Sequence, residues 1–208
     1  MANPVAPITV TEEITKEQIG RASDRFAERC RKNALSLPKT ASQQVLEDEG
    51  DALAQEMFEA FRRRVERRSK VIVRRVTVNR DQTPEQMIAA TGRKQYIDAK
   101  VLKTLPRQGS GTEEFDMYFV PAERYLTIDE QEKLLADYGL VPDYYGQIQV
   151  NIDDVAFADE RPNGAQWDNR DGSASFVAFG RDGGRCVRCG RGDDEWNDDW
   201  WFAGRRKS

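Results

Sequence analysis

The sequence of 208 residues contains no histidine. Histidine is the commonest general base in enzymes and the commonest metal ligand in proteins. Its absence excludes nucleophilic sites that pair serine or cysteine with histidine, and it excludes zinc sites that use imidazole ligands. We therefore expect a protein that is not an enzyme and that uses no cofactor.

Cysteine is scarce as well, with three residues in the chain. Cys186 and Cys189 form a C-x-x-C pair, and only Cys30 remains as a third thiol. A structural zinc normally takes four cysteine or histidine ligands, and residues three apart on a strand point to opposite faces of a sheet. We interpret the pair as two unrelated thiols and predict no metal site.

Long hydrophobic runs are missing too. No stretch approaches the roughly 18–20 apolar residues that cross a bilayer, so we expect no membrane span. Residues 1–13 lack a basic segment followed by an apolar one, which is the pattern of a secretory signal. The sequence therefore predicts no signal peptide, and a cytoplasmic location is the default expectation.

Basic charge is concentrated in residues 61–108, which hold 14 lysine and arginine residues against four acidic ones. Residues 109–208 hold 11 basic and 21 acidic residues. The basic segment predicts either a phosphate-binding surface for nucleic acid or a solvated face that pairs with the acidic half. We favour the second, because nucleic-acid binding usually adds exposed aromatics or a known motif. The most basic patch comprises Arg62, Arg63, Arg64, Arg67, Arg68, Arg74 and Arg75.

The acidic half offers two further alternatives. Residues 109–208 are acidic enough for an inhibitor that mimics nucleic acid, which requires carboxylates gathered on one face. The other alternative is an enzyme that uses paired carboxylates. We favour the interpretation that the carboxylates in question simply lie in a turn. The candidate carboxylates for such an enzyme are Asp153, Asp154, Asp159 and Glu160.

Residues 1–70 are predicted to be helical. Ile19, Phe26 and Cys30 recur at helical spacing within residues 15–37, and Pro38 ends that helix. Residues 42–69 predict a second amphipathic helix, so that the two form a helical hairpin. Because the apolar stripe is narrow, we expect the hairpin to pack on the main domain or on another copy, as a tether or a homo-oligomer contact.

Residues 71–208 predict an α+β domain. Strands are expected at 71–78 and 114–121, a short helix opens at Thr83-Pro84, and 96–105 fits a strand or a short helix. A helix over 127–138 has a capping box, Thr127 with Glu130, and a second helix is expected over 143–151. Four short antiparallel strands are expected to follow, at 166–167, 173–179, 185–192 and 200–205. The turn signals between them are Asn163-Gly164, Asp171-Gly172 and Asp182-Gly183-Gly184.

The C-terminal tail combines aromatic residues with an alternating set of small or polar ones. On a strand, residues two apart share a face, so one face carries Cys, Arg, Gly, Gly and Asp at positions 186, 188, 190, 192 and 194. The other face carries Val187, Cys189 and Arg191. The first set fits neither a core nor a catalytic site, and it indicates a display surface.

The order strand, helix, helix and then short strands rich in tryptophan resembles the C-type lectin-like fold. Residues 151–164, with Trp167, Asp171-Gly172, Ala178-Phe179 and the sequence WWFAG at 200–204, resemble target (variable) proteins of diversity-generating retroelements. The resemblance covers residues 71–208, with a C-type lectin-like portion from residue 112 onward and a variable region over 180–200. It is most specific over 151–205.

This resemblance implies a ligand-binding protein that displays a hypervariable surface toward a protein or cell-surface ligand. In such systems an error-prone reverse transcriptase rewrites adenines, and asparagine codons then yield Cys, Arg, Gly or Asp. The implied ligand-binding residues are Cys186, Arg188, Gly190, Gly192, Asp194, Asn197 and Asp199. The implied framework residues are Trp167, Trp196, Trp200, Trp201 and Phe202.

The chain departs from the pattern of these relatives in two places. Arg161 and Gln166 stand where many members carry histidine around the Pro-Asn-Gly segment. Residues 196–198 match the Trp-Asn-Asp calcium motif of sugar-binding lectins, but residues 161–163 read Arg-Pro-Asn in place of Glu-Pro-Asn. Because calcium prefers six to eight oxygen ligands, we predict no calcium-dependent sugar binding.

Overall fold

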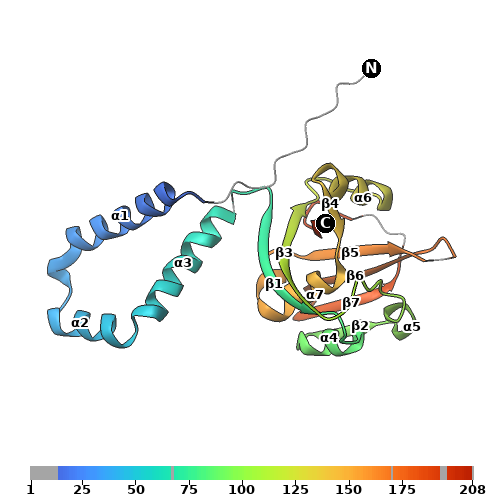
Figure 1. Ribbon diagram of the computed structural model, residues 1–208, viewed down its shortest axis with the longest axis horizontal. Coiled ribbons are helices and arrows are strands. Elements are labelled where there is room, and N and C mark those ends of the chain that lie inside the picture. The colour runs from blue at the N-terminus through green and yellow to red at the C-terminus, as the bar shows by residue number, and fades with distance from the viewer. Residues whose placement is uncertain (1–13, 67, 170, 193–195, 208) are drawn as a thin grey trace, which may run out of the picture. The chain divides into compact units, whose positions relative to one another are not determined.

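A computed structural model describes residues 14–66, 68–169, 171–192 and 196–207. These residues form eight α-helices and a mixed sheet of eight strands, which confirms the predicted α+β class. The chain divides into two compact units, with the boundary between Ser69 and Lys70 (Figure 1). Over the described residues, no helix is both long enough and apolar enough to pass through a bilayer.

The N-terminal unit contains three helices where the sequence predicted two. Helix α1 spans Lys16–Asn33, and Thr15 and Gln18 form a capping box at its start. The single helix expected over 42–69 is wrong: α2 spans Lys39–Asp48, Glu49 leaves the helical conformation, and α3 spans Gly50–Glu66. Gly50 explains the break, because glycine is a poor residue for a helix interior.

The apolar stripe of this unit is exposed. Helices α1 and α2 contain no buried residue among those described, although their sequences are amphipathic. The large apolar side chains left in contact with solvent are Ile14, Ile19, Phe26, Leu37, Val45, Leu46, Phe58, Phe61 and Val65.

The second unit is built on one curved sheet, with strand order β1-β3-β8-β5-β6-β7-β2 and with β4 paired to β8. The β5–β8 and β2–β7 pairs are parallel and the others are antiparallel. The prediction that the terminal strands are antiparallel is therefore wrong for one pair. Strand β8 lies between β3 and β5, and it runs parallel to β5. The strands are β1 (Ile72–Asn79), β2 (Lys94–Ile97), β3 (Thr112–Pro121), β4 (Leu140–Pro142), β5 (Asn163–Asp168), β6 (Ala174–Arg181), β7 (Arg185–Arg191) and β8 (Trp201–Arg206).

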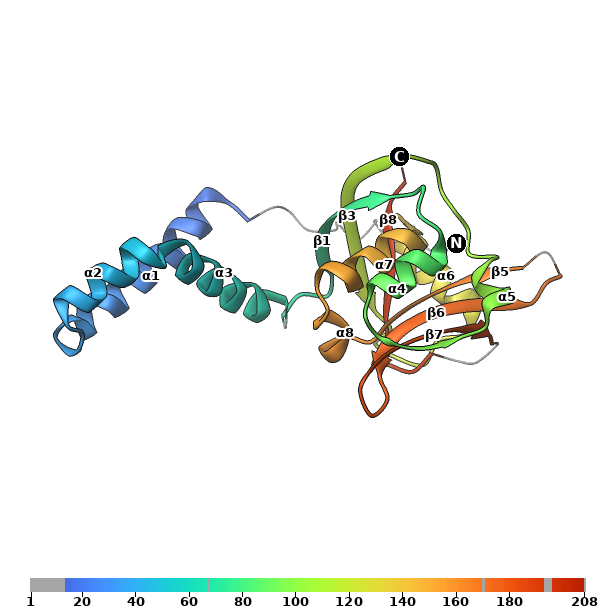
Figure 2. The ribbon, with the colours of Figure 1, turned by 90° about the horizontal axis from the view of Figure 1, so that it is seen from below.

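Five helices accompany this sheet. Figure 2 shows α4 and α7 between strands β1 and β3 on one side and strands β6 and β7 on the other. The predicted N-caps Thr83 and Thr127 are confirmed, each within a capping box. Residues 96–105, for which the sequence allowed a strand or a short helix, contain the end of strand β2 followed by helix α5. The helices are α4 (Pro84–Ala90), α5 (Ala99–Leu102), α6 (Ile128–Asp137), α7 (Tyr144–Asp153) and α8 (Phe157–Glu160).

Asn163 and Gly164 begin strand β5, so the turn predicted there is wrong. The Asn163 side chain is buried, and its Oδ1 accepts hydrogen bonds from Gln147 Nε2 at 3.0 Å and Asn151 Nδ2 at 2.9 Å. In a turn, an asparagine amide typically bonds to its own backbone. Here helix α7 supplies the partners, and the backbone is free to join the sheet.

A buried ion pair joins the end of β1 to the start of α7. The guanidinium of Arg80 donates to both carboxylate oxygens of Asp143, at 3.2 and 2.7 Å, and both side chains are almost fully buried. Asp143 also accepts from the backbone N–H of Gly146 at 2.8 Å, which caps α7. Glu113 receives hydrogen bonds from Arg80 and, at 2.8 Å, from Arg205 on β8. The network ties three strands to one helix.

We predict that Asp143→Ala lowers the free energy of unfolding by about 3–5 kcal/mol, because it leaves the charge of Arg80 buried without its main partner. Chemical denaturation measures the effect. Asp116→Ala is the control: Asp116 pairs with Arg75 at 3.1 Å on the exposed side of β1, and such pairs contribute about 0–1 kcal/mol. Equal losses in the two variants would contradict this account of the core.

Candidate functional site

Strands β6 and β7 present two chemically different faces. Val177, Phe179, Val187 and Cys189 point to one side and belong to the main core. The alternate residues point to the other side, where Arg188 lies opposite Ala178 and Cys186 opposite Gly180. The alternation predicted for the tail therefore exists in the sheet, and its second face carries the residues expected on display.

Two adjoining clefts hollow this second face. The first, of about 250 Å³, is lined by residues that include Asp159, Cys186, Asn197 and Asp199. The second, of about 200 Å³, is lined by residues that include Phe176 and Gln166, and we call it the aromatic cleft. The clefts share three wall residues, which are Ala178, Arg188 and Trp200.

Arg188 stands between the two clefts. Its guanidinium donates to Asp182 Oδ2 at 2.8 Å and lies 5.8 Å from the ring centroid of Tyr96. Tyr96 is on β2, whose parallel register places it beside Arg188. Sequence analysis missed Tyr96 as a neighbour of the site, because no local pattern reveals a parallel pair between residues so far apart in the chain.

Most of the predicted ligand-binding residues gather here. Cys186, Arg188, Asn197 and Asp199 line the first cleft, and Arg188 and Gly192 line the aromatic cleft. Cys186 is nearly buried, at 3% exposed, so it forms the floor of the cleft. Gly190 lines neither cleft.

Gly190 pairs with Phe176 across the β6–β7 ladder. A Cβ at this position would lie 3.8 Å from the Phe176 ring, which is an ordinary contact, whereas a Cβ at Gly192 would lie 3.0 Å from it. A side chain therefore fits at 190, and a side chain at 192 requires a small shift of the ring. Asp194 lies outside the described residues.

The predicted framework residue Trp196 holds the tail against the sheet. Its ring is 8% exposed and meets Trp200 and Phe202 edge-on, with centroids 4.8 and 5.5 Å away. Its Nε1 donates to Gln166 Oε1 at 2.7 Å. A Cβ at Gly164 would lie 2.5 Å from the Trp196 ring, so the ring occupies space that only glycine leaves open.

The remaining framework residues differ in burial. Phe202 is fully buried and Trp167 is 4% exposed, with Trp167 Nε1 donating to Thr104 Oγ1 at 3.1 Å. Trp200 and Trp201 are half-buried. The guanidinium of Arg161 lies 5.8 Å from the ring centroid of Trp201.

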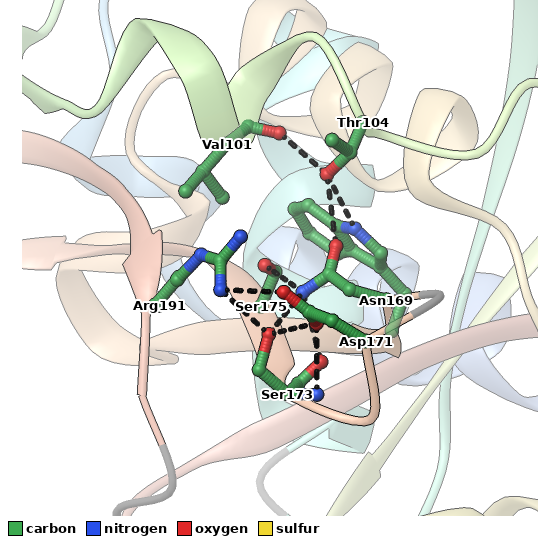
Figure 3. A network of polar contacts seen from close by, with 8 residues as sticks. Val101, Thr104, Asn169, Asp171, Ser173, Ser175 and Arg191 are labelled. Atoms are coloured by element: carbon green, nitrogen blue, oxygen red, sulfur yellow. Dashed lines mark hydrogen bonds and ion pairs between the residues drawn. The ribbon is translucent and has the colours of Figure 1, made fainter.

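Arg191 is predicted to share a face of β7 with Val187 and Cys189, but unlike them it is exposed and is not part of the core. Its guanidinium is exposed and donates to Asp171 Oδ2 at 2.9 Å and to Ser173 Oγ at 3.0 Å. Hydrogen bonds from Ser173 and Arg191 lower the pKa of Asp171 to about 2. Figure 3 shows this network, whose labelled members are Val101, Thr104, Asn169, Asp171, Ser173, Ser175 and Arg191.

The two C-x-x-C thiols lie on opposite sides of β7. Cys186 faces the first cleft and Cys189 faces the core, where burial raises the pKa of its thiol to about 12. Cys30 is exposed on α1. Within the described part of the chain, no three Cys, Asp or Glu side chains are grouped so as to hold a metal ion.

Three of the four candidate carboxylates lie on helices instead of the predicted turn, and Asp154 lies in the segment between α7 and α8. Asp153 ends α7, while Asp159 and Glu160 are in α8. Hydrogen bonds from Arg185, at 2.7 to 3.1 Å, hold the pKa of Asp159 below its usual value. Glu160 pairs with Arg161. Each of these acids in α8 therefore has an arginine partner beside the first cleft.

The basic patch divides between the two units. Arg74 lies 3.8 Å from Asp154, and Arg75 pairs with Glu114 and Asp116 at 3.3 and 3.1 Å. These partners belong to the acidic half, but only Arg75 of the two is solvent-exposed, since the Arg74 side chain is 11% exposed. Arg62 pairs with Glu59 within α3. Arg67 lies outside the described residues.

No protein-family model matches the chain, and no curated protein or solved structure is significantly similar to it. The resemblance to retroelement target proteins consequently depends on the residues and motifs of the chain itself.

We predict that Gly164→Ala destabilises the fold by about 1–3 kcal/mol, because an added methyl group forces the Trp196 ring off strand β5. Thermal or chemical unfolding measures the loss, and a change in tryptophan fluorescence reports the displaced ring. Gly184→Ala is the matched control, since no atom lies within 4 Å of a Cβ there. An equal effect of both substitutions would show that Trp196 does not depend on Gly164.

Proposed function

We propose that this protein is a non-enzymatic ligand-binding protein. Its C-terminal surface is diversified by a retroelement and displayed on a C-type lectin-like domain. The N-terminal helices tether or oligomerise that domain. The ligand is a protein or a cell-surface molecule that contacts the two clefts.

One observation carries the proposal. Five of the predicted ligand-binding residues, Cys186, Arg188, Gly192, Asn197 and Asp199, line two adjoining clefts on one face. They come from a strand and from the segment that follows it, and the residues between them, such as Val187 and Trp196, are buried. Separation of this kind is what a binding surface needs if its side chains are to change without disturbing the core.

The charges at the clefts support binding over catalysis. Asp159 in the first cleft and Asp182, the partner of Arg188, are each paired with an arginine. A general base or nucleophile works best when its pKa is tuned toward neutral pH, whereas the pKa of Asp159 is lowered. The same pairing makes an acidic mimic of nucleic acid less suitable, since both of these carboxylates have a positive neighbour.

A randomised library tests the binding role. Codons 186, 188, 190, 192, 197 and 199 are varied together, and the full-length variants are selected against a panel of unrelated proteins. We expect binders with distinct sequences that unfold as cooperatively as the parent. A second library at Val187, Cys189 and three other core positions is the control. If both libraries yield folded binders equally often, the display face has no special role.

The retroelement itself is tested in the genome. We expect a reverse transcriptase gene near this gene, with a near-copy of the codons for residues 180–200 that differs from them only at adenines. If neither is present, the diversification part of the proposal is wrong.

Oligomerisation through the N-terminal helices rests on their exposed apolar stripe, which includes Phe26 and Phe58. We predict that the protein self-associates at micromolar concentration and that Phe58→Ser weakens association by about tenfold or more, because it removes a large apolar contact. Sedimentation equilibrium measures the constant. Glu56→Ser, at an exposed polar position of the same helix, is the control. A monomer at all concentrations would contradict the prediction.

A further inference from the structure

The aromatic cleft contains a buried hydrogen-bond donor that has no partner. Gln166 lies in the cleft wall and is 4% exposed. Its Oε1 accepts the hydrogen bond from Trp196 Nε1. Because an indole N–H can only donate, this contact fixes the orientation of the carboxamide. Nε2 then takes the other position, and among the described residues it has no hydrogen-bond partner.

The walls around this donor are aromatic. Phe176 and Trp200 each meet Trp196 edge-on, with centroids 6.1 and 4.8 Å away, and all three rings line the cleft. Aromatic rings favour a planar ring in offset or edge-on contact. The volume of about 200 Å³ has room for one ring and little else. An unpaired buried donor is unfavourable, so the ring that fits best also carries an acceptor oxygen.

Arg188 adds a positive charge to the same cleft. In the free protein it pairs with Asp182, and both side chains are about half exposed, at 47% and 53%. Exposed ion pairs are weak, so an anionic group of a ligand can replace Asp182 at small cost. The chemistry of the cleft is thus a donor at the buried side, aromatic walls and a cation at the rim.

We propose that the aromatic cleft binds a single aromatic ring that carries a hydrogen-bond-accepting oxygen toward Gln166 and an anionic group toward Arg188. Gln166, Phe176, Trp196 and Trp200 lie outside the predicted variable set, so every variant of the surface keeps these parts of the subsite. The statement that all variants keep the subsite rests on the proposed function. The statement that this chain binds the ring is independent of it.

The test uses the full-length chain and follows the NMR signal of the Trp196 indole N–H, which reports on the Gln166 contact. The probes are 4-hydroxybenzoate, the uncharged 4-hydroxybenzamide, and cyclohexanecarboxylate as a non-aromatic control. Blocked tyrosine (N-acetyl-tyrosine amide) distinguishes a protein side chain from a free small molecule as the source of the ring. We expect the Trp196 signal to shift saturably with 4-hydroxybenzoate and with 4-hydroxybenzamide. We expect no saturation with cyclohexanecarboxylate.

Two variants separate the contributions. Gln166→Glu keeps the acceptor for Trp196 and replaces the free donor by a second acceptor. A phenol hydroxyl can donate to that carboxyl, whereas the ether oxygen of 4-methoxybenzoate can only accept, so we expect about tenfold weaker binding of 4-methoxybenzoate when the carboxyl is ionised. Arg188→Gln, at an exposed position that does not threaten the fold, weakens 4-hydroxybenzoate by about tenfold and leaves 4-hydroxybenzamide unchanged. Asp116→Asn, at a position of β3 that lines neither cleft, is the control and leaves both affinities unchanged.

Three results would overturn the inference. The first is no shift of the Trp196 signal up to about 10 mM probe, which corresponds to a binding free energy weaker than about −3 kcal/mol. The second is equal binding of cyclohexanecarboxylate, and the third is an effect of Asp116→Asn as large as that of Gln166→Glu. Saturable binding by the free ring alone supports a small molecule, and binding by blocked tyrosine as well supports a side chain. If the ring binds while the randomised library yields no binder, the proposed function fails and the subsite remains.

Discussion

The contact between Trp196 and strand β5 determines how the C-terminal tail lies. The ring packs over Gly164, where no other residue leaves room, and its N–H bonds to Gln166 two residues further along the same strand. The backbone of Trp196 also pairs with Leu126, through two hydrogen bonds of 2.9 Å. Fully burying a large apolar side chain stabilises a fold by about 1.5–3 kcal/mol. One tryptophan thus fixes the segment that walls both clefts.

The rest of the fold keeps strand β5 in position for this contact. On the opposite face of the sheet, the amides of Gln147 and Asn151 hold Asn163, the residue next to Gly164. The ion pair of Arg80 and Asp143 fixes the start of α7, which carries those amides. Burial of polar groups is tolerated when they are hydrogen-bonded, and these groups specify one orientation of the helix. The framework therefore extends well beyond the tryptophans.

Local signals predicted much of the secondary structure. The N-caps Thr83 and Thr127, the turns at Gly172 and Gly183, and the alternation in β7 were all evident in the sequence, because each depends on residues close together in the chain. The Asn163–Gly164 turn was wrong because tertiary partners replaced the local ones. Parallel pairing of β2 with β7 and the ion pair of Arg80 were not predictable, since they join residues more than 60 positions apart.

The candidate site was predicted in part, for the same physical reason. Alternation on one strand selects Arg188 and Gly192, but the opposite walls of the clefts come from other strands. Gln166 and Phe176 carry no sequence signal of a site. Gln166 differs from the residue that many retroelement target proteins carry, but that difference alone does not predict a role. Its role in the structure comes from the Trp196 N–H, which turns its amide N–H toward a place without an acceptor.

The central claim is that buried framework residues hold the tail while the side chains between them are free to vary. The most direct measurement is the folding stability of serine substitutions at each described position from 185 to 202. The account predicts an alternating profile, with losses of about 2–4 kcal/mol at Val187, Trp196 and Phe202 and changes within about 0.5 kcal/mol at Arg188 and Asp199. A flat profile, or large losses at Arg188 and Asp199, would contradict it.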